Sequence, residues 1–336
     1  MATYKGIQGY SVQSLASDPS PAQSVEGQLW YNSASNVWKI STSGAGAWAA
    51  SGTMNTPYVS GGVYIGTTTA GVYAGGIPGD VTTTQTYNGS IWAASPATLN
   101  TGRHYVTNTG LGTSTAGQVM GGEVPSGVSP TSVTDKSEQF DGSTWTEVNS
   151  LTSSRIAIIG AGTQAAGLAM TGGGGDVSGD GSVVVESWDG TSWTSGTSVN
   201  DARTYAMGGG TQTSALVAGG KYIHPNILDS AETWNGSTWT EVAVINTARE
   251  IGGRGVSSDS SGIIFGGSPP APGYVAISEV WNGSTWTEVG DLANARAAIG
   301  SDGTATAAIA AAGAPYTGVT EAWNDPVYAV KTVTTS

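Results

Sequence analysis

A six-residue unit that recurs along the chain constrains its fold more than any other feature. The unit consists of a large aromatic residue, Asn or Asp, Gly, Ser or Thr, one further residue, and Trp. Complete copies begin at Tyr87, Phe140, Trp188, Trp234 and Trp281, and a sixth begins at Trp323 but breaks off at Asp325-Pro326. Asn-Gly and Asp-Gly between β-forming runs signal a tight hairpin, because these residues tolerate positive φ. Each copy therefore predicts one β-hairpin.

A second hairpin precedes each of these units. Its markers are an Arg, a strand of small residues, a turn, another such strand, and a pair of small residues, which are Gly75-Gly76, Gly121-Gly122, Gly172-Gly173, Gly219-Gly220, Gly266-Gly267 and Ala312-Gly313. The Trp residues that end the complete units are 46 to 53 residues apart. Four strands in each period of about 50 residues describe one blade of a β-propeller. The composition agrees, because the chain has 52 Gly and only 10% charged residues, with few helix formers.

The sixth copy lacks its fourth strand, and a segment near the N-terminus can supply it. Residues 43–50 contain Trp48 and lead through Asn55 into the first blade, as Trp92 leads through Asn100 into the second. We therefore predict an all-β, six-bladed propeller over residues 41–324, with its last blade closed by an N-terminal strand. Such closure removes an exposed sheet edge.

The two ends of the chain do not follow the repeat. Residues 28–32 and 36–40 flank Ser33-Ala34-Ser35 and predict a small hairpin. A lone hairpin is marginal in water, so we expect Trp30, Tyr31 and Trp38 to dock on another surface. Residues 1–40 are therefore interpreted as an attachment segment, and residues 325–336 as a C-terminal tail.

Two charged positions recur with the repeat. One is an arginine, and the other is a glutamate two residues before the strand aromatic; they are Arg103, Arg155, Arg203, Arg249 and Arg296, with Glu138, Glu186, Glu232, Glu279 and Glu321. Side chains two apart on a strand share a face, so the glutamate is expected to be partly buried with the aromatic and to need a partner. We predict Arg–Glu pairs. The alternative is a ring of arginines at the channel mouth that binds an anion. The first blade lacks both residues and has Tyr58 and Gln85 instead.

Charge and composition exclude several classes of function. The net charge of −13 disfavours nucleic acid and anionic lipid as partners. No segment is typical of a signal peptide or a membrane span, so the chain is expected to be made in a cytoplasm. With no cysteine and two histidines, the sequence predicts no catalytic residues, no metal site and no cofactor.

The loops that join the second and third strands differ in every blade. They lie on the face opposite the Asn-Gly turns, and variable loops on a rigid scaffold are where recognition is usually found. Candidate ligand contacts on this face are Tyr222, His224, Tyr274 and Tyr316. The alternative is that these loops have drifted without function.

The repeated motifs resemble those of known proteins. The glycine pair, aromatic and spaced Trp are similar to the kelch motif of the galactose-oxidase central domain, although a chain without cysteine cannot form that enzyme's Tyr–Cys site. Residues 235–242, 246–249 and 210–213 resemble strings in kelch-like repeat proteins of tailed bacteriophages of the marine and cyanophage type, and residues 26–33 resemble the leader of phage virion proteins.

This resemblance implies a non-enzymatic structural protein on the exposed surface of a phage head or tail. Its partners would be other virion proteins, held through the N-terminal segment, together with further copies of itself and host-surface glycans. Two alternatives stay open at this point. One is an intracellular kelch-type scaffold that binds proteins, and the other is a carbohydrate-active enzyme on a propeller.

Overall fold

The computed structural model describes residues 13–18, 28–56, 61–77, 81–125, 132–174, 180–223, 226–315, 318–325 and 327–333. Within these residues the protein is all-β, with seven four-stranded sheets and no helix. The described part of the chain accordingly holds no helix suited to crossing a membrane. The chain divides into a large unit, Ala47–Asn324, and a small unit made of Met1–Gly46 with Asp325–Ser336.

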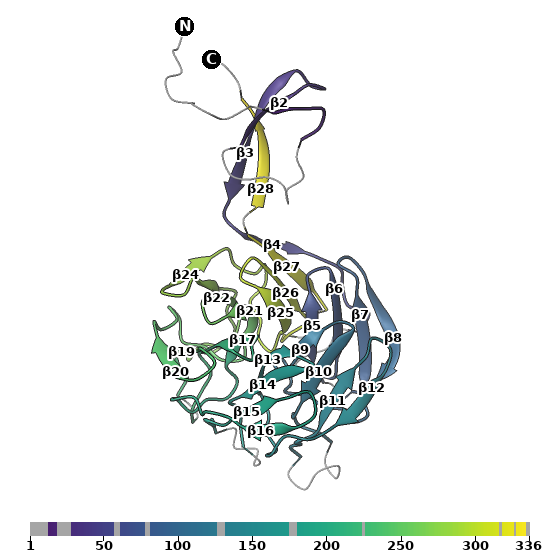
Figure 1. Ribbon diagram of the computed structural model, residues 1–336, viewed down its shortest axis with the longest axis vertical. Coiled ribbons are helices and arrows are strands. Elements are labelled where there is room, and N and C mark those ends of the chain that lie inside the picture. The colour runs from purple at the N-terminus through teal and green to yellow at the C-terminus, as the bar shows by residue number, and fades with distance from the viewer. Residues whose placement is uncertain are drawn as a thin grey trace. The chain divides into compact units, whose positions relative to one another are not determined.

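The large unit contains six of the seven sheets, numbered here in chain order (Figure 1). Sheet 1 consists of β5 (Val63–Thr67), β6 (Ala70–Ala74), β7 (Thr83–Tyr87) and β8 (Trp92–Thr98). Sheet 2 consists of β9 (Leu111–Thr113), β10 (Ala116–Met120), β11 (Ser137–Phe140) and β12 (Trp145–Val148). Sheet 3 consists of β13 (Ile159–Thr163), β14 (Ala166–Met170), β15 (Val185–Trp188) and β16 (Trp193–Ser195). Sheet 4 consists of β17 (Met207–Thr211), β18 (Ser214–Ala218), β19 (Ala231–Trp234) and β20 (Trp239–Val242). Sheet 5 consists of β21 (Gly253–Ser258), β22 (Ser261–Phe265), β23 (Ser278–Trp281) and β24 (Trp286–Val289). Sheet 6 consists of β25 (Gly300–Thr304), β26 (Ala307–Ala311), β27 (Thr320–Asn324) and β4 (Ala47–Ala50).

Neighbouring strands pair antiparallel in the six sheets of the large unit, and the prediction of an all-β chain built from four-stranded sheets is confirmed. The first strands, β5, β9, β13, β17, β21 and β25, contact one another in chain order, and β25 also contacts β5. In Figure 1 the first strands lie at the middle of the large unit and the fourth strands at its rim.

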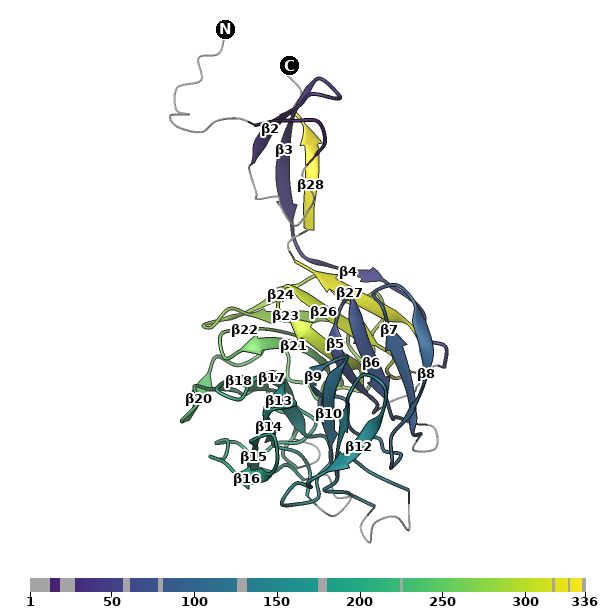
Figure 2. The ribbon, with the colours of Figure 1, turned by 45° about the vertical axis from the view of Figure 1, so that its right-hand side comes forward.

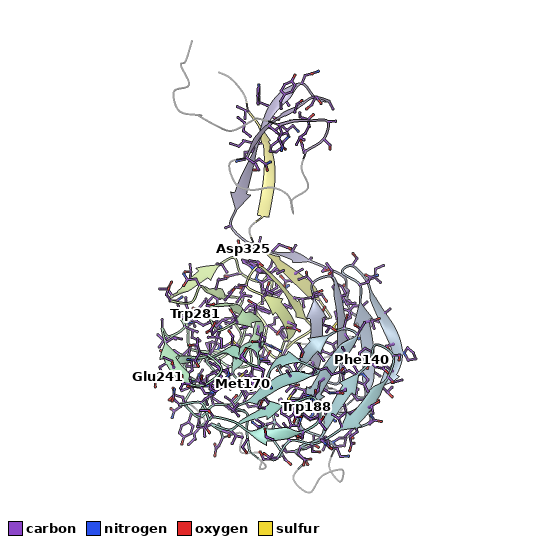
Figure 3. All side chains as sticks on the ribbon, viewed as in Figure 1. Phe140, Met170, Trp188, Glu241, Trp281 and Asp325 are labelled. Carbon is purple, nitrogen blue, oxygen red and sulfur yellow. The ribbon has the colours of Figure 1, made fainter. Side chains whose placement is uncertain are left out.

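Each recurring unit forms the tight hairpin that its Asn-Gly or Asp-Gly pair predicts. In sheet 4, Asn235 Oδ1 accepts hydrogen bonds from the backbone N–H groups of Ser237 and Thr238, each at 2.9 Å, and Gly236 has a φ of 92°. This turn places Trp234 directly opposite Trp239, with ring centroids 5.3 Å apart. Both rings are buried, and so are Phe140, Trp188 and Trp281, which begin the same unit in other sheets and are labelled in Figure 3.

Sheet 6 takes its fourth strand from the N-terminal side of the chain. Strand β4 pairs antiparallel with β27 and sets Trp48 opposite Trp323, the same opposition that the other sheets show. The strand is shorter than the predicted segment 43–50, because residues 43 and 44 end β3 of the small unit.

The small unit is a sheet in the order β1–β2–β3–β28, made of β1 (Gln13–Leu15), β2 (Leu29–Asn32), β3 (Val37–Gly44) and β28 (Val327–Thr332) (Figure 2). Strands β2 and β3 form the predicted hairpin, and β1 pairs parallel to β2. The C-terminal residues are not a tail, since β28 pairs antiparallel with β3. Asp325-Pro326 ends β27, but the β-branched residues that follow form a new strand.

Trp30 is fully buried inside the small unit, so its expected role in docking is corrected. Its indole Nε1–H donates to Asp18 Oδ1 at 3.2 Å. Tyr31 and Trp38 are register partners with ring centroids 5.5 Å apart, and Trp38 is 44% exposed. Because neighbours on a strand face opposite sides, these two side chains lie on the face opposite to that of Trp30.

We predict that acid weakens the small unit through Asp18. Hydrogen bonds from Lys39, at 2.9 Å, and Asn32, at 2.7 Å, lower the pKa of the Asp18 carboxyl below its ordinary value. A lowered folded-state pKa contributes stability above the unfolded pKa of about 3.9, and this stability is lost as the pH falls through the folded value. The Trp30 indole N–H resonance in NMR spectra should therefore titrate with a midpoint below about pH 3.9. The same resonance in Asp18→Asn serves as the control, and a titration that persists there would exclude Asp18 as its origin.

Candidate functional site

The repeated arginines and glutamates form five buried ion pairs. In sheet 2, Arg103 Nη2 lies 2.5 Å from Glu138 Oε1, and the other carboxylate oxygen accepts the backbone N–H of Asn100 at 2.7 Å. Each glutamate thus holds both the arginine and the loop that leads into the first strand of its sheet. The remaining pairs are Arg155–Glu186, Arg203–Glu232, Arg249–Glu279 and Arg296–Glu321.

The side chains of these arginines form hydrogen bonds inside the sheets. Arg103 Nη1 also donates to the carbonyl oxygens of Gly121 and Lys136, each at 2.9 Å, and all five side chains are nearly inaccessible to solvent. Burial lowers the pKa of Arg103, while the charge of Glu138 opposes that shift. The alternative of an arginine ring that binds an anion at the channel mouth does not fit this arrangement.

In sheet 1 an uncharged side chain holds the loop that leads into the first strand. Gln85 is buried, its Oε1 accepts the backbone N–H of Asn55 at 3.0 Å, and its Nε2 donates to the carbonyl of Thr56 at 3.4 Å. Tyr58 lies outside the described residues. A neutral amide therefore anchors the incoming loop where the repeat lacks both charged residues.

The sixth arginine, which the repeat does not explain, lies at the middle of the large unit. Arg254 Nη2 donates to the carbonyl of Gly110 at 2.7 Å, and its backbone N–H donates to Ser301 Oγ at 2.8 Å. Burial lowers the pKa of Arg254 and raises that of the Asp302 carboxyl, while each group's charge counteracts the other's shift. With Asn108, which donates to two further carbonyls, Arg254 forms a polar centre that links several sheets.

A ring of strained residues surrounds this centre on the face of the variable loops. The residue two positions after each repeat arginine has a φ between 51° and 58°; these residues are Tyr105, Ala157, Tyr205, Ile251 and Ala298. Positive φ costs a non-glycine residue on the order of 1–2 kcal/mol. Hydrogen bonds between sheets hold the conformation, since the N–H groups of Ala157, Ile251 and Ala298 donate to the carbonyls of Tyr105, Tyr205 and Ile251 at 2.9, 2.8 and 2.7 Å.

Chemically distinct side chains gather on part of this ring. The rings of Tyr105 and Tyr205 meet edge to face with centroids 5.7 Å apart, and the imidazole of His104 lies 4.4 Å from Tyr105. The ammonium of Lys221 lies 4.7 Å from the centre of the Tyr205 ring. Two flanking contacts, His104 Nε2 to Glu123 Oε2 and Lys221 Nζ to Glu250 Oε2, each measure 3.7 Å. We call these six residues the axial cluster.

The axial cluster occupies positions that the repeat fills with inert residues elsewhere. Bridges between backbone segments align His104 with Glu123 and Thr204 with Lys221. The equivalent bridges in sheets 3 and 6 join Ile156 with Gly173 and Ala297 with Ala314. None of these six residues is among the ligand contacts expected from the sequence. One signal could have found them, because they stand at positions where one repeat differs chemically from the next.

The two tyrosines of the axial cluster are suited to packing contacts rather than to nucleophilic chemistry. Burial raises the pKa of Tyr205 well above its ordinary value, and Tyr105 and the charge of Glu250 raise it further. Burial and Glu123 likewise raise the pKa of Tyr105. A nucleophile needs a lowered pKa or an adjacent base that takes its proton. Both phenols therefore keep their protons at neutral pH.

A pocket of about 240 Å³ adjoins the axial cluster, and it shares Lys221 and Glu250 with it. The other lining residues are Ile227, Ser268, Pro269, Pro270, Ala271 and Pro272. Two of the predicted contacts belong to the loops that form this pocket: Tyr222 is 45% exposed and Tyr274 is 44% exposed. The other two, His224 and Tyr316, lie outside the described residues.

A second cavity, of about 420 Å³, lies beside the tight turns of sheets 2 and 3, with Gln139 and Gln164 among its lining residues. These amides already bind the scaffold, since Gln164 Nε2 donates to the carbonyls of Gly117 and Phe140 at 3.1 and 3.2 Å. Among the described residues, no group of three or more His, Cys, Asp or Glu side chains could hold a metal ion. The loop face therefore holds the stronger candidate site, and its arrangement suits non-covalent binding.

Comparison with known proteins supports the fold. No protein-family model matches the sequence, and no curated protein matches it. A solved structure titled "Structure of YjhT" is similar, with a TM-score of 0.66 and 13% sequence identity over 84% of this chain and 99% of that one. At this identity the likeness concerns the fold alone. It agrees with a β-propeller-like arrangement of the four-stranded sheets.

Proposed function

We propose that this chain is a non-enzymatic virion protein of a tailed bacteriophage whose propeller presents a recognition face. The observation that carries the recognition role is the axial cluster. The tryptophans, arginines and glutamates recur from sheet to sheet, but the residues at the axial-cluster positions differ between sheets. The cluster lies next to a pocket and to exposed tyrosines. The virion assignment rests on the motifs that resemble phage proteins, in residues 210–213, 235–242 and 246–249.

The proposed architecture is a closed ring of six blades completed by β4. The Trp of each fourth strand donates its indole N–H to the preceding sheet or to the residues that directly follow that sheet's last strand, including the step from sheet 1 back to sheet 6. The acceptors for Trp48, Trp92, Trp145, Trp193, Trp239 and Trp286 are Ser278, Thr320, Thr84, Ser137, Thr197 and Ala243. The contact between β25 and β5 supports the same closure. The seventh sheet belongs to the small unit.

The small unit is proposed as the part that attaches to other virion proteins. Among the described residues of the small unit, Trp38 is a large aromatic residue with an exposed side chain, and Tyr31 packs against it. Exposed aromatic residues are frequent anchors at protein interfaces. Several copies of the chain would then be held on the same particle.

We expect the double variant Trp38→Ala, Tyr31→Ala to be incorporated into virions at least tenfold less than the original chain, because a lost anchor of 2 kcal/mol or more reduces affinity about thirtyfold. Mass spectrometry of purified particles measures the copy number. Ile91→Ala, which removes an equally apolar side chain that is 64% exposed in the large unit, is the control. Absence of the original chain from particles would exclude the virion role and leave the intracellular scaffold as the remaining interpretation.

A further inference from the structure

We propose that the pocket beside Lys221 and Glu250 binds an uncharged sugar ring, and that it discriminates against acidic sugars. This inference rests on the proposed recognition role of the loop face and names the chemical class of its ligand. It follows from three observations. The lysines and arginines of the large unit are already paired or buried, the pocket wall holds one pair of opposite charges, and apolar residues surround that pair.

The first observation is that every lysine and arginine of the large unit is already engaged. Eight of the eleven lie there, since only Lys5, Lys39 and Lys331 belong to the small unit. Five arginines are paired with buried glutamates, and Arg254 is buried near Asp302. Lys136 Nζ lies 2.7 Å from Glu147, and Lys221 Nζ lies 3.7 Å from Glu250.

A carboxylate, sulfate or phosphate on a ligand needs a cation to offset its desolvation. Among the described residues that line the pocket, Lys221 is the only lysine or arginine, and its charge is balanced by Glu250. The net charge of −13 adds repulsion. The loop face is therefore poorly suited to sialic acids, uronic acids and sulfated sugars.

The second observation is that the Lys221–Glu250 pair supplies donors and acceptors side by side. An ammonium carries three N–H donors, and a carboxylate carries acceptor oxygens only. The side chains of Lys221 and Glu250 are 17% and 13% exposed, so both still reach the pocket. Two neighbouring hydroxyl groups of a sugar can accept from the ammonium and donate to the carboxylate. A hydrocarbon ligand would displace solvent from both charged groups without offering either of them a hydrogen bond.

The third observation is the apolar surface around the pair. Pro269, Pro270 and Pro272 line the pocket, and Tyr222 and Tyr274 stand exposed on the same two loops. The C–H face of a pyranose ring packs on such rigid, flat side chains, which lose little conformational entropy on binding. A volume of about 240 Å³ is below the range of pockets for drug-sized ligands. It suits one ring at the end of a glycan or within it.

Saturation-transfer NMR on the full-length protein tests the inference. The probes are the methyl pyranosides of glucose, galactose, mannose and N-acetylglucosamine, with glucuronic acid and N-acetylneuraminic acid as the acidic counterparts. We expect at least one neutral probe to bind with a dissociation constant on the order of 1 mM, since a single ring makes few contacts. Its affinity should change less than twofold between 0.05 and 0.5 M NaCl, because binding of an uncharged ligand is not screened.

Two variants locate the binding. Tyr274→Ala removes an exposed platform that the fold does not need, and Lys221→Met removes the ammonium while keeping most of the side-chain length. Each should weaken binding about tenfold, whereas Ile91→Ala should leave it unchanged.

The inference is overturned if none of the neutral probes binds, if an acidic probe binds more tightly than they do, or if both variants bind as the original chain does. These measurements use the isolated protein, so their outcome is independent of whether the chain is found on particles. A propeller that is present on virions and binds no neutral sugar would retain the proposed location and lose this ligand class.

Discussion

Replacing Glu138 with alanine is expected to lower the free energy of unfolding of the large unit by about 3–5 kcal/mol, because it leaves the buried guanidinium of Arg103 without its counter-charge. The backbone N–H groups of Asn100 and Thr101 lose their acceptor as well. Urea denaturation followed by tryptophan fluorescence measures the change. The loss would move the unfolding midpoint well below that of the original chain.

Two further variants show whether the charge itself is responsible. Glu147→Gln removes a surface partner of Lys136 whose side chain is 44% exposed, and it should cost less than about 1 kcal/mol. The double variant Arg103→Met, Glu138→Gln should recover part of the loss, because it removes the orphaned cation and installs the amide that Gln85 provides in sheet 1. If Glu138→Ala cost no more than Glu147→Gln, the buried pairs would have no special role in stability.

A large unit that begins at residue 51 is expected to be less stable by about 5 kcal/mol or more than one that begins at Ala47. The shorter chain lacks β4, and with it the ladder to β27 and the side chain of Trp48. Trp48 packs 4.5 Å from the ring centre of Phe265 and donates its indole N–H to Ser278 Oγ at 2.9 Å. These interactions join sheet 6 to sheet 5.

Size-exclusion chromatography gives a second readout of the same comparison. Without β4 the backbone groups of β27 that pair with it form an open edge, and open edges promote association between molecules. The shorter chain should therefore elute partly as oligomers, while the chain that begins at Ala47 elutes as one species. Equal stability and equal elution would show that β4 is not needed to complete the fold.

The repeat made most of this fold predictable. Asn-Gly and Asp-Gly turns, paired aromatics and glycine pairs are local signals, and each was sufficient to define a hairpin, as at Trp234 and Trp239. Strand β28 was not predicted, because Asp325-Pro326 indicates the end of a strand. Nothing local in Val327–Thr332 indicates which strand it pairs with. Trp30 was assigned to docking because no local pattern in the sequence shows that its indole N–H binds Asp18.

The site was harder to predict than the fold for a related reason. The variable loops directed attention to Tyr222 and Tyr274, which are exposed. Tyr105, Tyr205 and Lys221 come together only because separate sheets bring them to the same central ring. Their convergence depends on the three-dimensional arrangement of the sheets. The sequence carried only the indirect signal that neighbouring repeats differ at these positions.

The chain passes between its two units twice, and both crossings start from paired strands. Ala47 is the register partner of Asn324, and Gly44 is that of Val327. A pulling force applied to the small unit would therefore reach two neighbouring strands of sheet 6, β4 and β27, at the same end of their ladder. Each tether would bear part of the load, and the backbone could be cut in one crossing while the other still held. If the chain is anchored through its small unit, as proposed, this double tether would provide mechanical redundancy.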